Sequence, residues 1–384
     1  MRVFVIGYGQ AGGRIADAFI EYAKKTGQHF VARAIAINTA RADLIGLKNI
    51  PMEDRIMVGE SLTRGHGIGA DNEMGARVAT DEIYTIQSEI DKRGTHHVDA
   101  FLIVAGLGGG TGSGGAPVLA RRLKKLYEEP VYGLGVLPAK DEGSLFSLNA
   151  ARSLMTFVNE VDNLFIFDND AWKKGGESVK EAFVDINDEI VRRFGILFGA
   201  GEANEVGQMV VDAAEVINTL KGGGVSTIGY ASEQIESDGG FLKKFTSKKK
   251  TMDNLDSVTR ISSLVRRAIA GRLTIPCDVS TAERALIIAA GPPKELSRKG
   301  IEKAKVRVEE IIRGKEVRGG DFPLVKGQHV STIVLFSGVS DVPRIKELHE
   351  IGIEAQETMK EVSSEKEKDY QKLLGGNDAI KPLF

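Results

Sequence analysis

The sequence has little of three features that mark broad classes of protein. Among 384 residues there is one cysteine, Cys277, so the chain cannot close an intramolecular disulfide. No stretch reaches the roughly 18 apolar residues that cross a bilayer, and 51 basic residues nearly balance 53 acidic ones. This balance provides no broad positive field that would attract nucleic acid. We therefore expect a cytoplasmic protein that neither binds nucleic acid nor inserts into a membrane.

Short apolar runs alternate with amphipathic helical patterns in the N-terminal half. The pattern predicts helices at Ile15–Tyr22, Arg77–Ile90 and Pro117–Tyr127, and strands at Val3–Ile6, Ala34–Ile37, Phe101–Val104, Val131–Leu137 and Leu164–Phe167. Continuous apolar strands separated by helices are typical of a parallel sheet that is covered on both faces. The sequence therefore predicts an α/β, Rossmann-like domain, in which ligands bind at the carboxyl ends of the strands.

The C-terminal half predicts a long helix followed by a smaller α/β unit. A helical pattern over residues 177–198 ends before the glycine cluster Gly222–Gly224. Further on, strands at Ala285–Ala290 and Thr332–Phe336 flank a helix at Lys299–Ile312. Beyond the last strand the chain becomes charged and polar, a composition that predicts a flexible tail.

A first glycine-rich turn follows the first predicted strand. Gly9, Gln10, Ala11 and Gly12 end a Gly-x-Gly-x-x-Gly pattern that opens a helix, where free backbone N–H groups can bind a phosphate. Alone, this pattern also fits the dinucleotide-binding fold of a dehydrogenase. That fold needs an acidic residue at the end of the second strand to bind a ribose. The second strand here ends in Asn38 and Thr39, which disfavours the dehydrogenase hypothesis.

The strongest signal is a second loop with seven glycines in the ten positions Gly106–Gly115. It lies between a buried strand and a helix, which a flexible linker would not do. Successive backbone N–H groups can form an anion-binding nest, and Thr111 and Ser113 add hydroxyl donors. No Gly-Lys-Ser/Thr sequence follows, so this is not a Walker-type loop. A third loop, Gly65–Glu73, has alternate glycines before a helix and is a weaker candidate for the same role.

Gly106–Gly115 resembles the glycine-rich signature of the tubulin/FtsZ superfamily of GTPases. Other loops agree in order: Gly9–Gly12, Ile37–Thr39, Pro138–Gly143, Phe167–Asn169, and Ala182–Phe183 with Asn187–Asp188. The resemblance covers roughly residues 1–230, and its mixture of tubulin-like and FtsZ-like loops favours the archaeal CetZ branch. Several positions depart from FtsZ, since Ala40 replaces an Asp, Phe146 replaces an Arg and Val210 replaces an Asn.

The resemblance implies that the chain binds GTP or GDP together with Mg²⁺. It assigns the ribose to Glu142, the guanine to Asn169 and Asn187, and the base stack to Phe183. An Asn amide offers both an acceptor and a donor, which suits the N1–H and N2–H donors and the O6 acceptor of guanine. The metal ligands stay unassigned, with Gln10 and Asp71 as candidates. The remaining expected nucleotide contacts are Gly9, Ala11, Gly12, Asn38, Gly69, Ala70, Gly106, Gly108, Gly109, Gly110, Thr111, Gly112 and Ser113.

Asp212 and Glu215 are the candidate catalytic pair. Their spacing of three predicts two carboxylates on one face of a helix, a pattern that a solvated helix face also produces. The segment resembles the FtsZ loop that enters the nucleotide pocket of the neighbouring subunit, and α-tubulin also has Glu at the second position. The resemblance implies that Glu215 orients and activates the attacking water, with Asp212 in support.

From these features we expect four parts: a GTP-binding domain (1–176), a central helix (177–201), a C-terminal domain that begins with the catalytic loop (202–352) and a tail (353–384). The chain would polymerise head to tail and hydrolyse GTP at a site that the next subunit completes, in cell shape or division. The tail is a candidate site for a partner protein. Two alternatives stay open: an NAD(P)-dependent oxidoreductase, and a GTP-binding regulator that does not polymerise.

Overall fold

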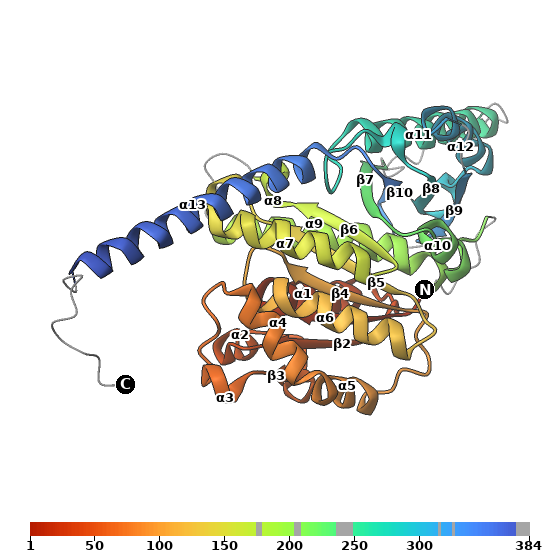
Figure 1. Cartoon of the computed structure of the whole chain (residues 1–384). Helices are drawn as coiled ribbons and strands as arrows, with labels where there is room; N and C mark the ends of the chain where they lie inside the picture. Colours follow the sequence, from red (N-terminus) through yellow and green to blue (C-terminus); the bar gives the residue numbers. More distant parts are fainter. Residues whose placement is uncertain (174–178, 203–208, 236–248, 314–315, 325–326, 374–384) are drawn as a thin grey trace.

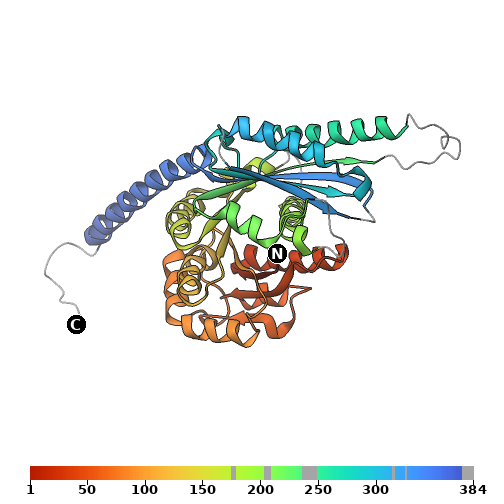
Figure 2. The same cartoon turned by 90° about the vertical axis from the view of Figure 1, so that its right-hand side faces the viewer.

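The computed structural model describes residues 1–173, 179–202, 209–235, 249–313, 316–324 and 327–373. Within these residues the strands form one ten-stranded sheet in the order β3-β2-β1-β4-β5-β6-β7-β10-β8-β9. Helices cover the sheet on both sides (Figures 1 and 2). No helix in the described part of the chain has an apolar stretch long enough to span a membrane.

The first six strands are parallel: β1 (Val3–Tyr8), β2 (Val31–Asn38), β3 (Arg55–Met57), β4 (Ala100–Gly106), β5 (Val131–Leu137) and β6 (Asn163–Asp168). Alternate side chains of β1 enter different cores, because Phe4 and Ile6 pack in one apolar cluster and Val3 and Val5 in the other. Two buried faces explain why these strands read as continuous apolar runs.

The helices of this half are α1 (Gly9–Thr26), α2 (Arg41–Ile45), α3 (Glu60–Thr63), α4 (Asn72–Asp81), α5 (Ile83–Lys92), α6 (Thr111–Leu126), α7 (Ser144–Glu160) and α8 (Asn169–Trp172), with short 3-10 turns η1 (Met52–Asp54) and η2 (Lys140–Glu142). The sequence predicts one helix over Arg77–Ile90, and this prediction is wrong. The helix breaks at Glu82, whose side chain instead accepts a hydrogen bond from the backbone N–H of Gly59.

The second half begins with the central helix α9 (Val179–Gly199). It continues through η3 (Ala200–Glu202), α10 (Ala213–Leu220), β7 (Val225–Gln234), α11 (Lys249–Ala270), η4 (Val279–Thr281), β8 (Arg284–Gly291), η5 (Pro293–Glu295), α12 (Arg298–Ile311), β9 (Glu316–Pro323), β10 (His329–Val339) and α13 (Pro343–Leu373). Strand β10 is antiparallel to β7 and β8, whereas β9 is parallel to β8. Strand β7 is parallel to β6 and pairs with it through Leu164 with Val225 and Phe165 with Ser226.

The C-terminal helix α13 corrects one prediction. The sequence predicts a flexible tail over 353–384, but the helix continues to Leu373 and extends away from the body of the molecule (Figures 1 and 2). Its first part is held by Leu348, which is buried in the core, and its polar part is rich in Glu and Lys, which are strong helix formers. Low hydrophobicity therefore does not imply disorder here. Residues 374–384, the apolar end of the chain, lie outside the described residues.

Candidate nucleotide-binding site

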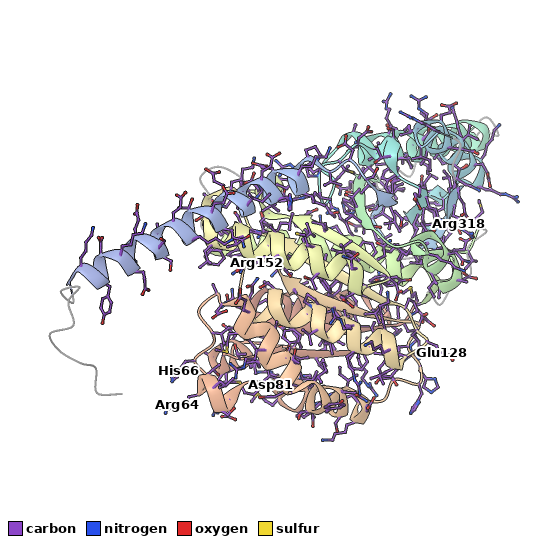
Figure 3. All side chains as sticks on the ribbon, viewed as in Figure 1. Arg64, His66, Asp81, Glu128, Arg152 and Arg318 are labelled. Carbon is purple, nitrogen blue, oxygen red and sulfur yellow. The ribbon has the colours of Figure 1, made fainter. Side chains whose placement is uncertain are left out.

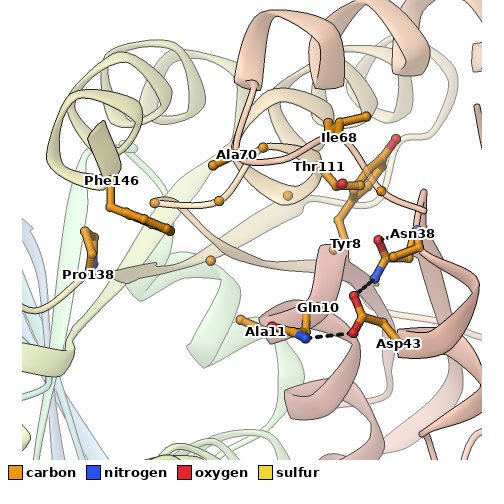
Figure 4. A pocket seen from close by; sticks show the side chains of 18 of the residues that line it. Tyr8, Gln10, Ala11, Asn38, Asp43, Ile68, Ala70, Thr111, Pro138 and Phe146 are labelled. Atoms are coloured by element: carbon orange, nitrogen blue, oxygen red, sulfur yellow. Dashed lines mark hydrogen bonds between the residues drawn. The ribbon is translucent and has the colours of Figure 1, made fainter. Parts of the chain in front are cut away.

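A cavity of about 350 Å³ lies at the carboxyl ends of the parallel strands (Figure 4). It gathers residues from loops that are far apart in the sequence, as the parallel topology requires. Fifteen predicted nucleotide contacts line it: Gly9, Gln10, Ala11, Asn38, Gly69, Ala70, Gly106, Gly108, Gly109, Gly110, Thr111, Gly112, Glu142, Asn169 and Phe183.

The wall of the cavity offers backbone N–H groups rather than cationic side chains. Helix α1 begins at Gly9 and helix α6 at Thr111, so both present unsatisfied N–H donors and a positive dipole end to the cavity. Of the described residues that line it, none is Lys or Arg. An anionic ligand would therefore be held mainly by the backbone.

The glycines of Gly106–Gly115 serve two purposes. A Cβ atom at Gly114 would stand 2.2 Å from the carbonyl oxygen of Asn72, so this glycine allows α6 to pack against the start of α4. A Cβ atom at Gly109 would meet no atom within 4 Å, and this residue lines the cavity. The sequence predicts a phosphate cradle over the whole loop, whereas in the structure the loop is divided between helix packing and cavity wall.

Asn169 and Phe183 give the cavity the features of a base-binding end. The side-chain oxygen of Asn169 is buried and has no hydrogen-bond partner among the residues that the structure describes. A buried orphan acceptor is costly unless a ligand donor meets it. Phe183, on α9, lines the same cavity while 38% of its surface is exposed, which suits an aromatic ring that stacks on a ligand.

Glu142 sits in a loop that its own side chain stabilises. One of its two carboxylate oxygens accepts a hydrogen bond from the backbone N–H of Ala139 at 2.7 Å. The neighbouring Phe146 packs near Gly108 in the cavity wall, at the position where FtsZ has an Arg. This loop therefore contributes a carboxylate and an aromatic ring.

Asp43 is a lining residue that the sequence analysis missed. Its carboxylate accepts one hydrogen bond from the side-chain amide of Gln10 at 2.7 Å and another from that of Asn38 at 3.1 Å (Figure 4). Its place just after the end of β2 is the signal that could have identified it. Tyr8 and Val136 are further lining residues without a sequence prediction. The remaining lining residues belong to loops or positions that the sequence singles out without assigning them a ligand contact: Ala40, His66, Gly67, Ile68, Pro138 and Phe146.

Four predicted contacts do not line the cavity: Gly12, Asp71, Ser113 and Asn187. A Cβ atom at Gly12 would stand 2.1 Å from the carbonyl oxygen of Val104, so Gly12 allows close packing of α1. Asp71 caps α4 by accepting from the backbone N–H of Met74 at 2.9 Å. Ser113 is buried, and its hydroxyl contacts the carbonyl groups of its own loop. Asn187 lies one helical turn beyond Phe183.

The structure places Asp212 differently from the prediction of two carboxylates within a helix. Asp212 precedes α10 as its N-cap, and its carboxylate accepts from the backbone N–H of Glu215 at 2.9 Å. The preceding Met209 exchanges two hydrogen bonds with Asp321 on β9, at 2.9 and 2.8 Å. Burial raises the pKa of Glu215, and the cationic Arg318 acts against that rise.

The candidate catalytic pair and the cavity lie at opposite ends of the central helix α9. Phe183 near its start lines the cavity, and Phe198 lies fifteen residues later, near its end. Just beyond that end, a Cβ atom at Gly201 would stand 3.3 Å from the Cα atom of Asp212. Fifteen residues of helix span about 22 Å. In Figure 3 the lining residue His66 and Arg318, whose charge acts on Glu215, lie on opposite sides of the molecule. The pair therefore cannot reach the cavity of its own chain.

The described residues contain no cluster of three or more His, Cys, Asp or Glu side chains that could hold a metal ion. Mg²⁺ commonly binds through one or two carboxylates together with substrate phosphates. Asp43, beside Gln10 in the cavity, fits such a limited role.

Known proteins resemble this chain along nearly its whole length. Residues 2–176 match the model of the Tubulin/FtsZ family, GTPase domain, and residues 176–354 match that of Tubulin-like CetZ, C-terminal domain. Tubulin-like protein CetZ1 of Haloferax volcanii is 55% identical over 94% of each chain.

Solved structures share the fold, among them two from Haloferax volcanii. The GDP-bound monomer of CetZ1 from Haloferax volcanii has a TM-score of 0.84 at 53% identity and covers 93% of this chain and 100% of that chain. The GTPγS-bound protofilament of CetZ2 from Haloferax volcanii has a TM-score of 0.83 at 40% identity, with 94% and 100% covered.

Proposed function

This chain belongs to the tubulin/FtsZ family, in its CetZ branch, and from that premise we propose that it is a GTP-binding, GTP-hydrolysing cytoskeletal protein that polymerises head to tail. The observation that carries the proposal is the placement of the cavity and of Glu215 at opposite ends of α9. Two such ends complete one site only when two subunits stack in the same direction.

Each part of the cavity has an assigned role in this proposal. The N-terminal ends of α1 and α6 hold the phosphates, and Gly109 leaves room for them. Asn169 accepts from the N–H donors of guanine, Phe183 stacks on the base, and Glu142 binds the ribose hydroxyls. Asn187 remains a proposed base contact that would require a small shift of α9 or of the ligand.

Hydrolysis is assigned to Glu215 of the adjacent subunit. Its carboxylate orients the attacking water and accepts a proton from it. Asp212 supports Glu215 by capping the first turn of α10. Bound Mg²⁺ would neutralise phosphate charge, and Asp43 and Gln10 are the lining residues that we propose as its ligands. The same proposal includes a cytoplasmic location and a role in cell shape or division. It also divides the chain into a GTP-binding domain, a central helix and a C-terminal domain, at residues 1–176, 177–201 and 202–352.

The test combines base selectivity with assembly. Purified protein is loaded with a fluorescent guanine nucleotide, and unlabelled GTP and ATP compete for the cavity. We expect GTP to displace the label at far lower concentration than ATP, because adenine would leave the acceptor of Asn169 opposite another acceptor. Electron microscopy and sedimentation with GTP should then show filaments. Equal competition would contradict the guanine assignment, and selective binding without filaments would indicate a non-polymerising regulator instead.

A further inference from the structure

The first turn of α13 contacts two loops at the base-binding end of the cavity, one after β5 and one at the end of β6. Arg344 is buried, with 5% of its side chain exposed, and donates a hydrogen bond to the carbonyl oxygen of Pro138 at 3.0 Å. Its Nε atom forms an ion pair with the carboxylate of Asp168 at 3.5 Å, and that carboxylate is also buried. One turn later, Glu347 pairs with Lys140 at 2.6 Å.

The two loops that Arg344 joins carry the ribose and base contacts. Pro138 begins the segment that contains Glu142, and Asp168 immediately precedes Asn169. The loops also contact each other directly, since the backbone N–H of Lys140 donates to the carboxylate of Asp170 at 3.0 Å. Arg344 therefore touches one loop from each of two neighbouring strands, β5 and β6, at the points where they enter the cavity.

Attachment of the helix does not by itself require this buried charge. Helix α13 already packs on the body of the molecule through Leu348 and Ala355, which are buried. A buried ion pair is weak evidence for stability, because removing two charges from water costs about as much as their attraction returns. What such a pair does supply is fixed geometry, because a guanidinium has a planar set of donors.

We propose that Arg344 is a positioning residue for nucleotide recognition, which holds the Glu142 and Asn169 loops at a fixed separation and couples α13 to the base-binding end of the cavity. The inference rests on the proposed function, since it takes the ligand to be a guanine nucleotide. Coupling is reciprocal, so the nucleotide must stabilise the first turn of α13 to the same degree that this turn favours the nucleotide.

The test removes both charges together, because Arg344→Met alone would leave the buried Asp168 carboxylate without its cationic partner. Asp168→Asn alone would leave Arg344 with the half-exposed Glu347 at 3.1 Å as its carboxylate partner. In the double variant Arg344→Met with Asp168→Asn, the new Asn can still accept from the backbone N–H of Asp170, as Asp168 does at 3.2 Å. The control is Lys346→Met on the same helix, where Lys346 pairs with Asp341 in an exposed ion pair. Nucleotide-free thermal unfolding is measured first, to establish that each variant is folded.

We expect the double variant to bind GDP about tenfold more weakly, the effect of losing roughly one buried hydrogen bond, and to lose part of its preference for GDP over the inosine nucleotide that lacks the N2 amino group. The control should bind within about twofold of the unchanged protein. A folded double variant with unchanged GDP affinity and selectivity would overturn the inference.

A second measurement uses the unchanged protein and does not depend on any variant. Hydrogen exchange is followed over the first turn of α13, Pro343–Glu347, with and without GDP. Slower exchange on GDP binding supports the coupling, and unaltered exchange in the GDP-bound protein overturns it. An unchanged protein that binds no GDP would instead contradict the proposed function from which the inference starts.

Discussion

Asn169 has a buried side-chain oxygen for which the described part of the chain supplies no hydrogen-bond partner. Replacing it with Leu removes this orphan acceptor, so the nucleotide-free protein should be at least as stable as before. The affinity for GDP should fall by about 1–3 kcal/mol, because the donors of guanine lose a buried partner. Isothermal titration and thermal unfolding measure the two effects separately. Asn187→Leu is the matched comparison. If Asn187→Leu weakens GDP binding by this amount and Asn169→Leu does not, the base contact belongs to Asn187.

Asp168 should make stability depend on pH. Burial raises the pKa of Asp168 to about 6, although the Arg344 guanidinium acts in the opposite direction. The pKa of Asp in an unfolded chain is about 3.9. The folded protein thus binds this proton more tightly than the unfolded chain, and the free energy of unfolding falls as the pH rises from about 4 to about 6, then levels off.

The variant Asp168→Asn lacks this titration and serves as the reference. Denaturant unfolding at several pH values gives the difference in stability between the unchanged protein and the variant, in which other titrating groups largely cancel. Relative to the variant, the unchanged protein should lose free energy of unfolding as the pH rises from about 4 to about 6, and the difference should be constant above about pH 6. A constant difference over the whole range would show that Asp168 titrates normally.

At the scale of elements, Asp212 has two roles that variants can separate: it caps α10, and its charge is available to act in hydrolysis. Asp212→Asn keeps an oxygen that can cap the helix, whereas Asp212→Ala removes the cap and should cost about 1 kcal/mol. We predict that the Asn variant keeps most of the GTP turnover and that the Ala variant loses turnover and stability together. A stable Asn variant with turnover as low as that of the Ala variant would mean that the charge of Asp212 acts directly in hydrolysis.

Strands were the elements most fully predicted from the sequence. All seven predicted strands lie within β1, β2, β4, β5, β6, β8 and β10. They were recognisable because strands that are buried on both faces have continuous apolar runs. Strand β9 (Glu316–Pro323) was missed, since its Glu, Arg and Gly residues resemble a loop and its pairing with β8 is invisible in the local sequence. Helix α7 was missed for a related reason, because its polar residues include Asn149, which bonds to the carbonyl groups of Ala70 and Gly108.

The candidate site was predicted mainly through its loops. Glycine-rich segments at strand ends predict a phosphate site, since so many glycines are costly to order in a folded loop. The sequence could not divide these glycines between ligand contact and packing, because Gly109 and Gly114 differ only in what surrounds them in space. Asp43 and Arg344 were missed for the same reason, as their partners are distant in the chain or belong to other elements.

At the scale of the whole molecule, the central claim is that one subunit holds GTP and the next supplies Glu215. Two variants isolate these contributions. Glu215→Ala removes the carboxylate but keeps the backbone N–H that Asp212 caps. Gly109→Trp fills the cavity from a position where a Cβ atom would have no atom of the described residues within 4 Å apart from its neighbours in the chain, whereas a Cβ atom at Gly110 would stand 2.8 Å from the backbone nitrogen of Asp71.

The most direct measurement is the GTPase rate of these two variants alone and mixed. Each alone should be nearly inactive, and their mixture should recover turnover, because an intact cavity from the first meets an intact Glu215 from the second at up to about a quarter of randomly formed junctions. A chain that carries both changes, mixed with either single variant, should recover nothing. If the two single variants sediment together with GTP yet their mixture stays inactive, the site is not completed by the neighbouring subunit and the account is wrong.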